Sequence, residues 1–97
     1  MGIFVREGAF RDRARFLESL RALVGRLREK EARGMSEAWE RREDADVARL
    51  SGFGALMEFT VAESSWKCTV EIPPWLPIPQ AALEAKFDEK VAELSGL

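Results

Sequence analysis

Histidine is absent from this chain of 97 residues, and cysteine occurs once, at Cys68. Without histidine the chain lacks the commonest metal ligand and the commonest general acid or base near neutral pH. It can therefore form neither a Cys-His nor a Ser-His-Asp arrangement. A single cysteine excludes an intrachain disulfide, which fits a reducing compartment. We expect no catalytic residues, no metal site and no cofactor, and a cytoplasmic location.

Long apolar runs are missing as well. No stretch approaches the roughly 20 apolar residues that are needed to span a bilayer. The start of the chain, Met1 to Arg6, contains no segment that resembles a signal peptide. We therefore expect a protein without a transmembrane segment.

The residues that are present are typical of a folded protein, since 46% are apolar and 33% are charged. The length suits one hydrophobic core, so we expect a single domain over residues 1–97. So small a domain is only marginally stable, and self-association would add materially to its stability. The expected macromolecular partner is another protein or a second copy of the chain in a homodimer.

The longest periodic segment predicts a helix from about Ala9 to Arg33. Its apolar residues recur at spacings of three and four and form one stripe, which comprises Phe10, Ala14, Leu17, Leu20, Val24 and Leu27. Phe16 and Leu23 widen this stripe, as expected for a helix that lies on a sheet. Gly34 stands where a glycine would end the helix.

Short strands are predicted on both sides of this helix. One precedes it at residues 3–5, and the others follow at 38–42, 47–50, 57–61 and 66–72. In the last of these, Trp66, Cys68, Val70 and Ile72 alternate with polar residues, so these four side chains are predicted to face the core. Gly52-Phe53-Gly54 is too short for a phosphate-binding loop and predicts a tight turn.

Four prolines between Pro73 and Pro79 must take the chain out of the sheet, because proline neither donates to a strand ladder nor continues a helix. A second helix is predicted over Gln80–Leu94, with an apolar stripe of Leu83, Phe87, Val91 and Leu94. The fold class that follows is α+β: an antiparallel sheet of about four strands with two amphipathic helices packed on one face, in the order β-α-β-β-β-β-α.

One candidate surface is basic. Residues 1–33 carry nine Lys or Arg against five Asp or Glu, and the rest of the chain carries six against twelve. The candidate basic face of the first helix comprises Arg11, Arg15, Arg21, Arg26, Arg28 and Arg33. Because acidic residues lie between the arginines and no exposed aromatic residues do, we favour a solvated outer face over a nucleic-acid partner.

The other candidate surface is the proline-rich segment, where Trp75, Leu76 and Ile78 stand between prolines. Two interpretations are open. Either Trp75 and Leu76 plug the space under the last helix, or these apolar side chains contact a protein partner, a second copy or a lipid-like surface.

The order of features resembles a family of small bacterial proteins, the putative polyhydroxyalkanoic acid system proteins, also described as granule-region proteins. The features that carry the resemblance are Trp39, the acidic turn Asp44 to Asp46, Leu50-Ser51-Gly52-Phe53-Gly54, the segments Met57 to Val61 and Trp66 to Ile72, Leu76-Pro77, and Leu83, Phe87, Val91 and Leu94. The chain departs from this pattern in its additional prolines and in the arginines of the first helix. The resemblance implies an accessory role in storage-polyester metabolism, with no catalytic residues.

Three functional hypotheses follow. The first is a non-catalytic accessory or binding protein that meets a polyhydroxyalkanoate granule through an apolar surface around Trp75. The second is a protein that holds a small hydrophobic ligand between the sheet and the helices. The third is a regulatory module whose basic first helix meets nucleic acid.

Overall fold

The computed structural model describes residues 2–30 and 33–97. The elements are β1 (Gly2–Ala9), α1 (Arg13–Lys30), β2 (Ser36–Arg42), β3 (Ala45–Gly52), β4 (Ala55–Val61), β5 (Ser65–Ile72), α2 (Gln80–Val91) and the 3-10 helix η1 (Ala92–Leu94). Their order confirms the predicted α+β class. The sheet contains all five strands of the predicted order, because β1 joins the four strands that follow α1.

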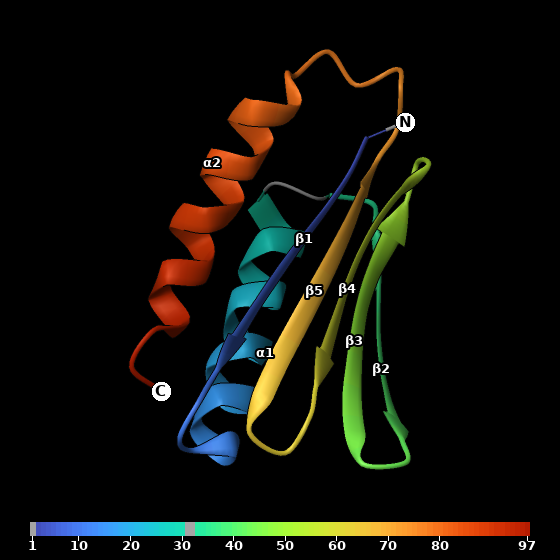
Figure 1. The fold of residues 1–97 in the computed structure, drawn as a ribbon. Coiled ribbons are helices and arrows are strands. Elements are labelled where there is room, and N and C mark those ends of the chain that lie inside the picture. Colours follow the sequence, from blue (N-terminus) through green and yellow to red (C-terminus); the bar gives the residue numbers. More distant parts are fainter. Residues whose placement is uncertain (1, 31–32) are drawn as a thin grey trace.

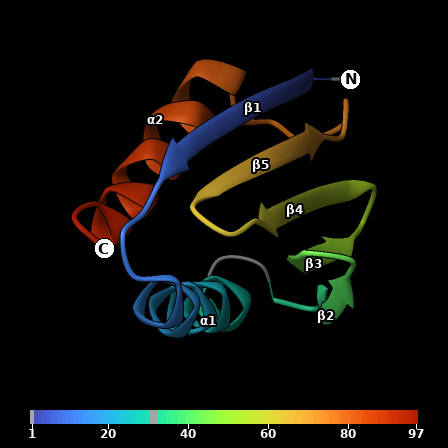
Figure 2. The same cartoon turned by 60° about the horizontal axis from the view of Figure 1, so that its bottom comes forward.

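The five strands form one antiparallel sheet in the order β1-β5-β4-β3-β2 (Figure 1). Strands β2 to β5 are joined in sequence as hairpins. The first strand, β1, pairs with the last strand, β5, and forms the edge of the sheet opposite β2; for example, Phe4 lies opposite Val70. Figure 2 shows that the sheet curves and that both helices lie on its concave side. This arrangement places the predicted core face of β5 against the helices.

The hairpin between β3 and β4 turns at Phe53 and Gly54, as the sequence predicts. Both residues have positive φ, 55° at Phe53 and 81° at Gly54. Two successive residues of this kind are typical of a two-residue type I′ turn, whose twist matches that of the adjoining strands. The turn places the Phe53 ring outside the core, where 63% of the residue surface is exposed.

The first helix begins four residues later than predicted. Strand β1 continues through Ala9, and the backbone amide of Phe10 donates to the carbonyl oxygen of Ser64. The carboxylate of Asp12 accepts a hydrogen bond of 3.1 Å from the amide of Arg15, so that Asp12 caps the helix. The predicted end near Arg33 crosses residues 31–32, which lie outside the described residues.

The main core lies between α1 and the inner face of the sheet. The fully buried side chains of α1 are Phe16, Leu20, Leu23 and Val24, while Ala14 of the predicted stripe is exposed. The buried stripe of α1 is therefore rotated towards Phe16 and Leu23, which were expected only to widen it. Facing it are Phe59 and Cys68, which are 1% and 0% exposed.

Candidate functional site

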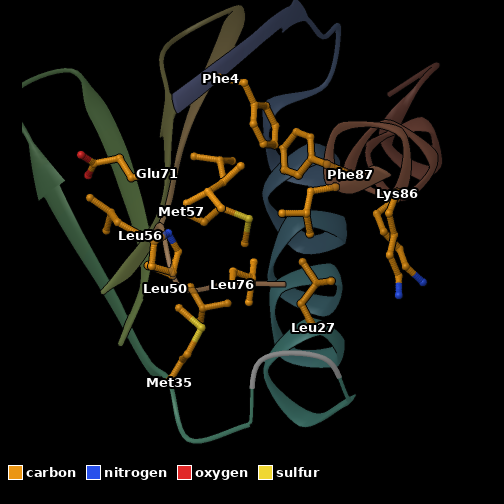
Figure 3. Close-up of a pocket in the computed structure, with 16 residues that line it drawn as sticks. Phe4, Leu27, Met35, Leu50, Leu56, Met57, Glu71, Leu76, Lys86 and Phe87 are labelled. Atoms are coloured by element: carbon orange, nitrogen blue, oxygen red, sulfur yellow. The ribbon is translucent and has the colours of Figure 1, made fainter. Parts of the chain in front are cut away.

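An apolar pocket of about 220 Å³ lies beside this core, between the inner face of the sheet, α1 and α2 (Figure 3). Its floor is one row of side chains across four strands: Phe4 of β1, Val70 of β5, Met57 of β4 and Leu50 of β3. These residues are cross-strand neighbours on one face, which is why the sheet presents them together. The floor of the pocket is thus set by strand register.

The two helices supply the opposite wall. Leu27 of α1 and Leu83 and Phe87 of α2 line the pocket. The rings of Phe4 and Phe87 meet edge to face with centroids 5.5 Å apart, and Figure 3 shows this pair side by side. Because the pair joins the edge strand to α2, it closes one side of the pocket.

The second helix rests on the sheet more lightly than the first. Among its described residues none is fully buried, although Phe87 and Val91 pack against the core. An ion-pair cluster adds to this contact, because the guanidinium of Arg6 on β1 donates to Glu84 at 2.7 Å and to Asp88 at 2.8 Å. The hydrogen bond from Arg6 lowers the pKa of Glu84. This cluster holds α2 over β1, and the space beside Leu83, Lys86, Phe87 and Lys90 of the helix remains open as the pocket.

Charged side chains lie only at the margin of the pocket. Lys86 and Lys90 of α2 and Glu71 of β5 complete its lining. Figure 3 shows the Glu71 carboxylate pointing away from the pocket, and Lys86 on the α2 side. The charge nearest to the pocket is therefore positive and comes from α2.

Each of the two interpretations left open by the sequence fits part of the proline-rich segment. Trp75 is 62% exposed and Ile78 is 46% exposed, so neither plugs the space under α2. Leu76 is half-buried and lines the pocket together with Pro73. The segment thus contributes one aliphatic side chain to the pocket wall and displays two apolar side chains outside it.

The arginines of the candidate basic face are all exposed, at Arg11, Arg15, Arg21, Arg26, Arg28 and Arg33. Arg11 precedes α1, which corrects its assignment to the helix. Three of the six contact neighbouring elements. Arg21 stacks over the ring of Trp39 at 4.1 Å, Arg26 pairs with Glu93 at 2.6 Å, and Arg28 pairs with Glu37 of β2 at 3.7 Å. Part of this face therefore stabilises the contact of α1 with β2 and with the C-terminal turn.

The sequence predicted an inward Cys68, and the structure confirms it. The thiol is buried on β5, and this burial raises its pKa well above the usual range. A thiol reagent reacts with the thiolate, so both access and ionisation are suppressed in the folded protein. We expect Cys68 to react with a maleimide at least about a hundredfold more slowly in the native protein at pH 7 than in urea, because opening must precede reaction.

A cysteine at Ser64, in the exposed turn before β5, is the matched control for that measurement. The Ser64→Cys variant should show one rapidly labelled thiol and one slow thiol in the intact mass spectrum. Rapid, stoichiometric labelling of the unsubstituted protein would show instead that Cys68 is accessible.

The pocket could be anticipated from the sequence only in outline. The alternation in β5 predicted that Val70 faces inward, but alternation does not reveal whether a helix covers that position. The sequence did suggest a ligand held between the sheet and the helices, without naming the pocket residues. Of these, Leu27 lies near the C-terminal end of α1 and Met35 follows the helix, and periodicity does not predict how closely either packs on the sheet.

A scan against protein-family models and a search of curated proteins found no match to the chain. The resemblance to granule-region proteins thus stays a prediction from the sequence. Within residues 2–30 and 33–97, no helix is long and apolar enough to cross a membrane. The same residues contain no group of three or more His, Cys, Asp or Glu side chains that could hold a metal ion.

Proposed function

We propose that this protein binds a small apolar ligand in the pocket between the sheet and the two helices. The observation that carries the proposal is a contrast between adjacent rows on one face of the sheet. The row of Cys68, Phe59 and Ala48 is sealed by α1, at 0%, 1% and 2% exposure. In the next row Phe4 and Leu50 at the two ends are buried, whereas Met57 and Val70 in the middle are only half-buried and line the pocket.

Leaving the side chains of Met57 and Val70 incompletely covered has a free-energy cost. Apolar surface in contact with water costs roughly 25 cal/mol per Å² relative to buried surface, and protein interiors normally fill such spaces with side chains. A concave space with apolar walls and a few polar groups at its margin is the usual form of a ligand site. An apolar ligand would complete the packing that α2 leaves unfinished.

A neutral aliphatic probe tests the proposal. We expect 1-octanol to bind at one saturable site in isothermal titration calorimetry, with a negative heat-capacity change when the titration is repeated at two temperatures, because binding removes apolar surface from water. Native mass spectrometry of the purified protein reports a retained ligand and the oligomeric state in the same spectrum. Absence of saturable binding up to the solubility limit of 1-octanol would contradict the proposal.

A second candidate function is adhesion to an apolar particle surface, such as a storage-polyester granule. Three exposed apolar side chains favour it: Phe53, Trp75 and Ile78. The turn at Phe53 and the proline-rich segment lie at the same end of the molecule (Figure 1), and the Trp75 indole nitrogen is 3.6 Å from the position of a Cβ added to Gly54. Prolines restrict the segment before contact, which lowers the entropy lost on binding.

The double variant Trp75→Ala with Ile78→Ser tests this second function. We expect it to reduce adsorption to polyhydroxybutyrate particles at least about fivefold, while its melting temperature stays within about 3 °C of the original, because both side chains are exposed. Leu76 is left unchanged, since it lines the pocket. Unaltered adsorption would count against a particle-binding role for this end of the molecule.

A further inference from the structure

We propose that the pocket takes a linear aliphatic carboxylate of about six to eight carbons, with its chain on the apolar floor and its carboxylate between α1 and α2. The proposal rests on the proposed function and assigns the chemical class of the ligand. Two features carry it: the size of the pocket and the charge of the groove that adjoins it.

Size limits the length of the chain. The pocket has a volume of about 220 Å³. A water molecule in the liquid occupies about 30 Å³, and a methylene group is of comparable size, so the space holds about seven such groups. This is below the usual volume for a drug-sized ligand, which begins at about 300 Å³. A long-chain fatty acid would not fit inside over its whole length.

The groove between the helices supplies the charge. A smaller space of about 80 Å³ is lined by Leu23, Arg26, Leu27, Lys30 and Lys90, and it shares Leu27 and Lys90 with the pocket. Its lining thus combines cationic side chains from both helices and includes no carboxylate. A ligand lying on Met57 can therefore extend past Leu27 into cationic surroundings.

Lysine is suited to this role even where it already has a partner on the protein. Its ammonium group carries three donors, so it can bind a ligand carboxylate in addition to an existing partner. Lys86 and Lys90 are four residues apart and lie on one face of α2, which places both along the same margin of the pocket. Lys90 lines both the pocket and the groove, so it is the residue to test.

Calorimetry with two matched series tests the ligand class: carboxylates of four to ten carbons and 1-alkanols of the same lengths, at pH 7 and low salt. We expect affinity to rise about fourfold for each added methylene and to level off near eight carbons. Octanoate should bind about three- to tenfold more tightly than 1-octanol, and this advantage should shrink at high salt.

The variant Lys90→Met removes the charge and keeps an unbranched apolar side chain. It should bring the affinity for octanoate down to that for 1-octanol, because only the carboxylate uses the ammonium charge. Lys67 is exposed on the outer face of β5, so Lys67→Met should leave the preference for octanoate unchanged. Equal affinities for octanoate and 1-octanol, or an equal loss of both in Lys90→Met, would overturn the carboxylate assignment and leave the apolar pocket standing. Failure of both series to bind would overturn the proposed function itself.

Discussion

Replacing Phe59 by alanine should lower the free energy of unfolding by about 3–5 kcal/mol. Phe59 is 1% exposed at the centre of β4, and its ring centroid is 5.9 Å from that of Trp66 and 6.1 Å from that of Phe87. The ring therefore joins the core under α1 to the contact of α2 with the sheet. Removing the ring would leave a cavity and weaken the packing of both helices on the sheet.

Urea unfolding monitored by circular dichroism measures this effect. A small domain has a total stability of about 5–15 kcal/mol, so the variant should lose a large part of it and its urea midpoint should fall by about 2 M or more. Phe53→Asn is the matched control, because Phe53 is 63% exposed and asparagine tolerates its positive φ. That control should change stability by no more than about 0.5 kcal/mol. A loss below about 1 kcal/mol in Phe59→Ala would place the ring outside the packed core.

Replacing Val70 by aspartate should weaken 1-octanol binding about 30-fold or more. Val70 lies in the floor of the pocket, between Phe4 and Met57. A ligand would have to strip water from the new carboxylate without offering it a partner, at a cost of about 2 kcal/mol or more. From the sequence alone this substitution would be expected to unfold the domain. Because Val70 is only half-buried and borders the open pocket, we expect instead a moderate stability loss of about 1–3 kcal/mol and a folded variant.

The neighbouring residue Thr69 provides the control. It faces the outer side of the sheet, directly opposite Glu58, so an aspartate there would place two carboxylates across from each other. Thr69→Lys avoids this repulsion and should leave both stability and 1-octanol binding nearly unchanged. Similar binding losses in Val70→Asp and Thr69→Lys would show that the floor of the pocket is not where the ligand sits.

Local patterns were sufficient to predict the order of the elements. Alternation in β5 identified Cys68 as inward, the prolines marked the exit from the sheet, and Gly52-Phe53-Gly54 marked a hairpin turn. The first strand was underestimated because a glycine usually weakens a strand, whereas Gly8 lies within β1 opposite Trp66. A glycine there leaves room for the indole, whose nitrogen would lie 2.7 Å from an added Cβ.

The pocket depends on features that periodicity does not encode. An apolar stripe on α2 predicted a helix packed on the sheet, yet how closely that helix approaches depends on particular contacts such as Phe87 against Phe4 and Arg6 against Glu84. Sequence patterns also treat an inward residue as a buried one. Val70 and Met57 face inward and remain only half-buried, because the two helices leave an open pocket above them.

The most direct test of ligand binding in this pocket is methyl NMR spectroscopy of protein labelled at its methionine and leucine methyl groups, during titration with 1-octanol. Met35 and Met57 line the pocket from two different segments, and Leu20 is fully buried in the core under α1. We predict saturable shifts of the Met35 and Met57 methyl signals with one common dissociation constant, and little change at Leu20. If the signals of Met35 and Met57 stay in place while 1-octanol binds, the ligand sits elsewhere and the central claim is wrong.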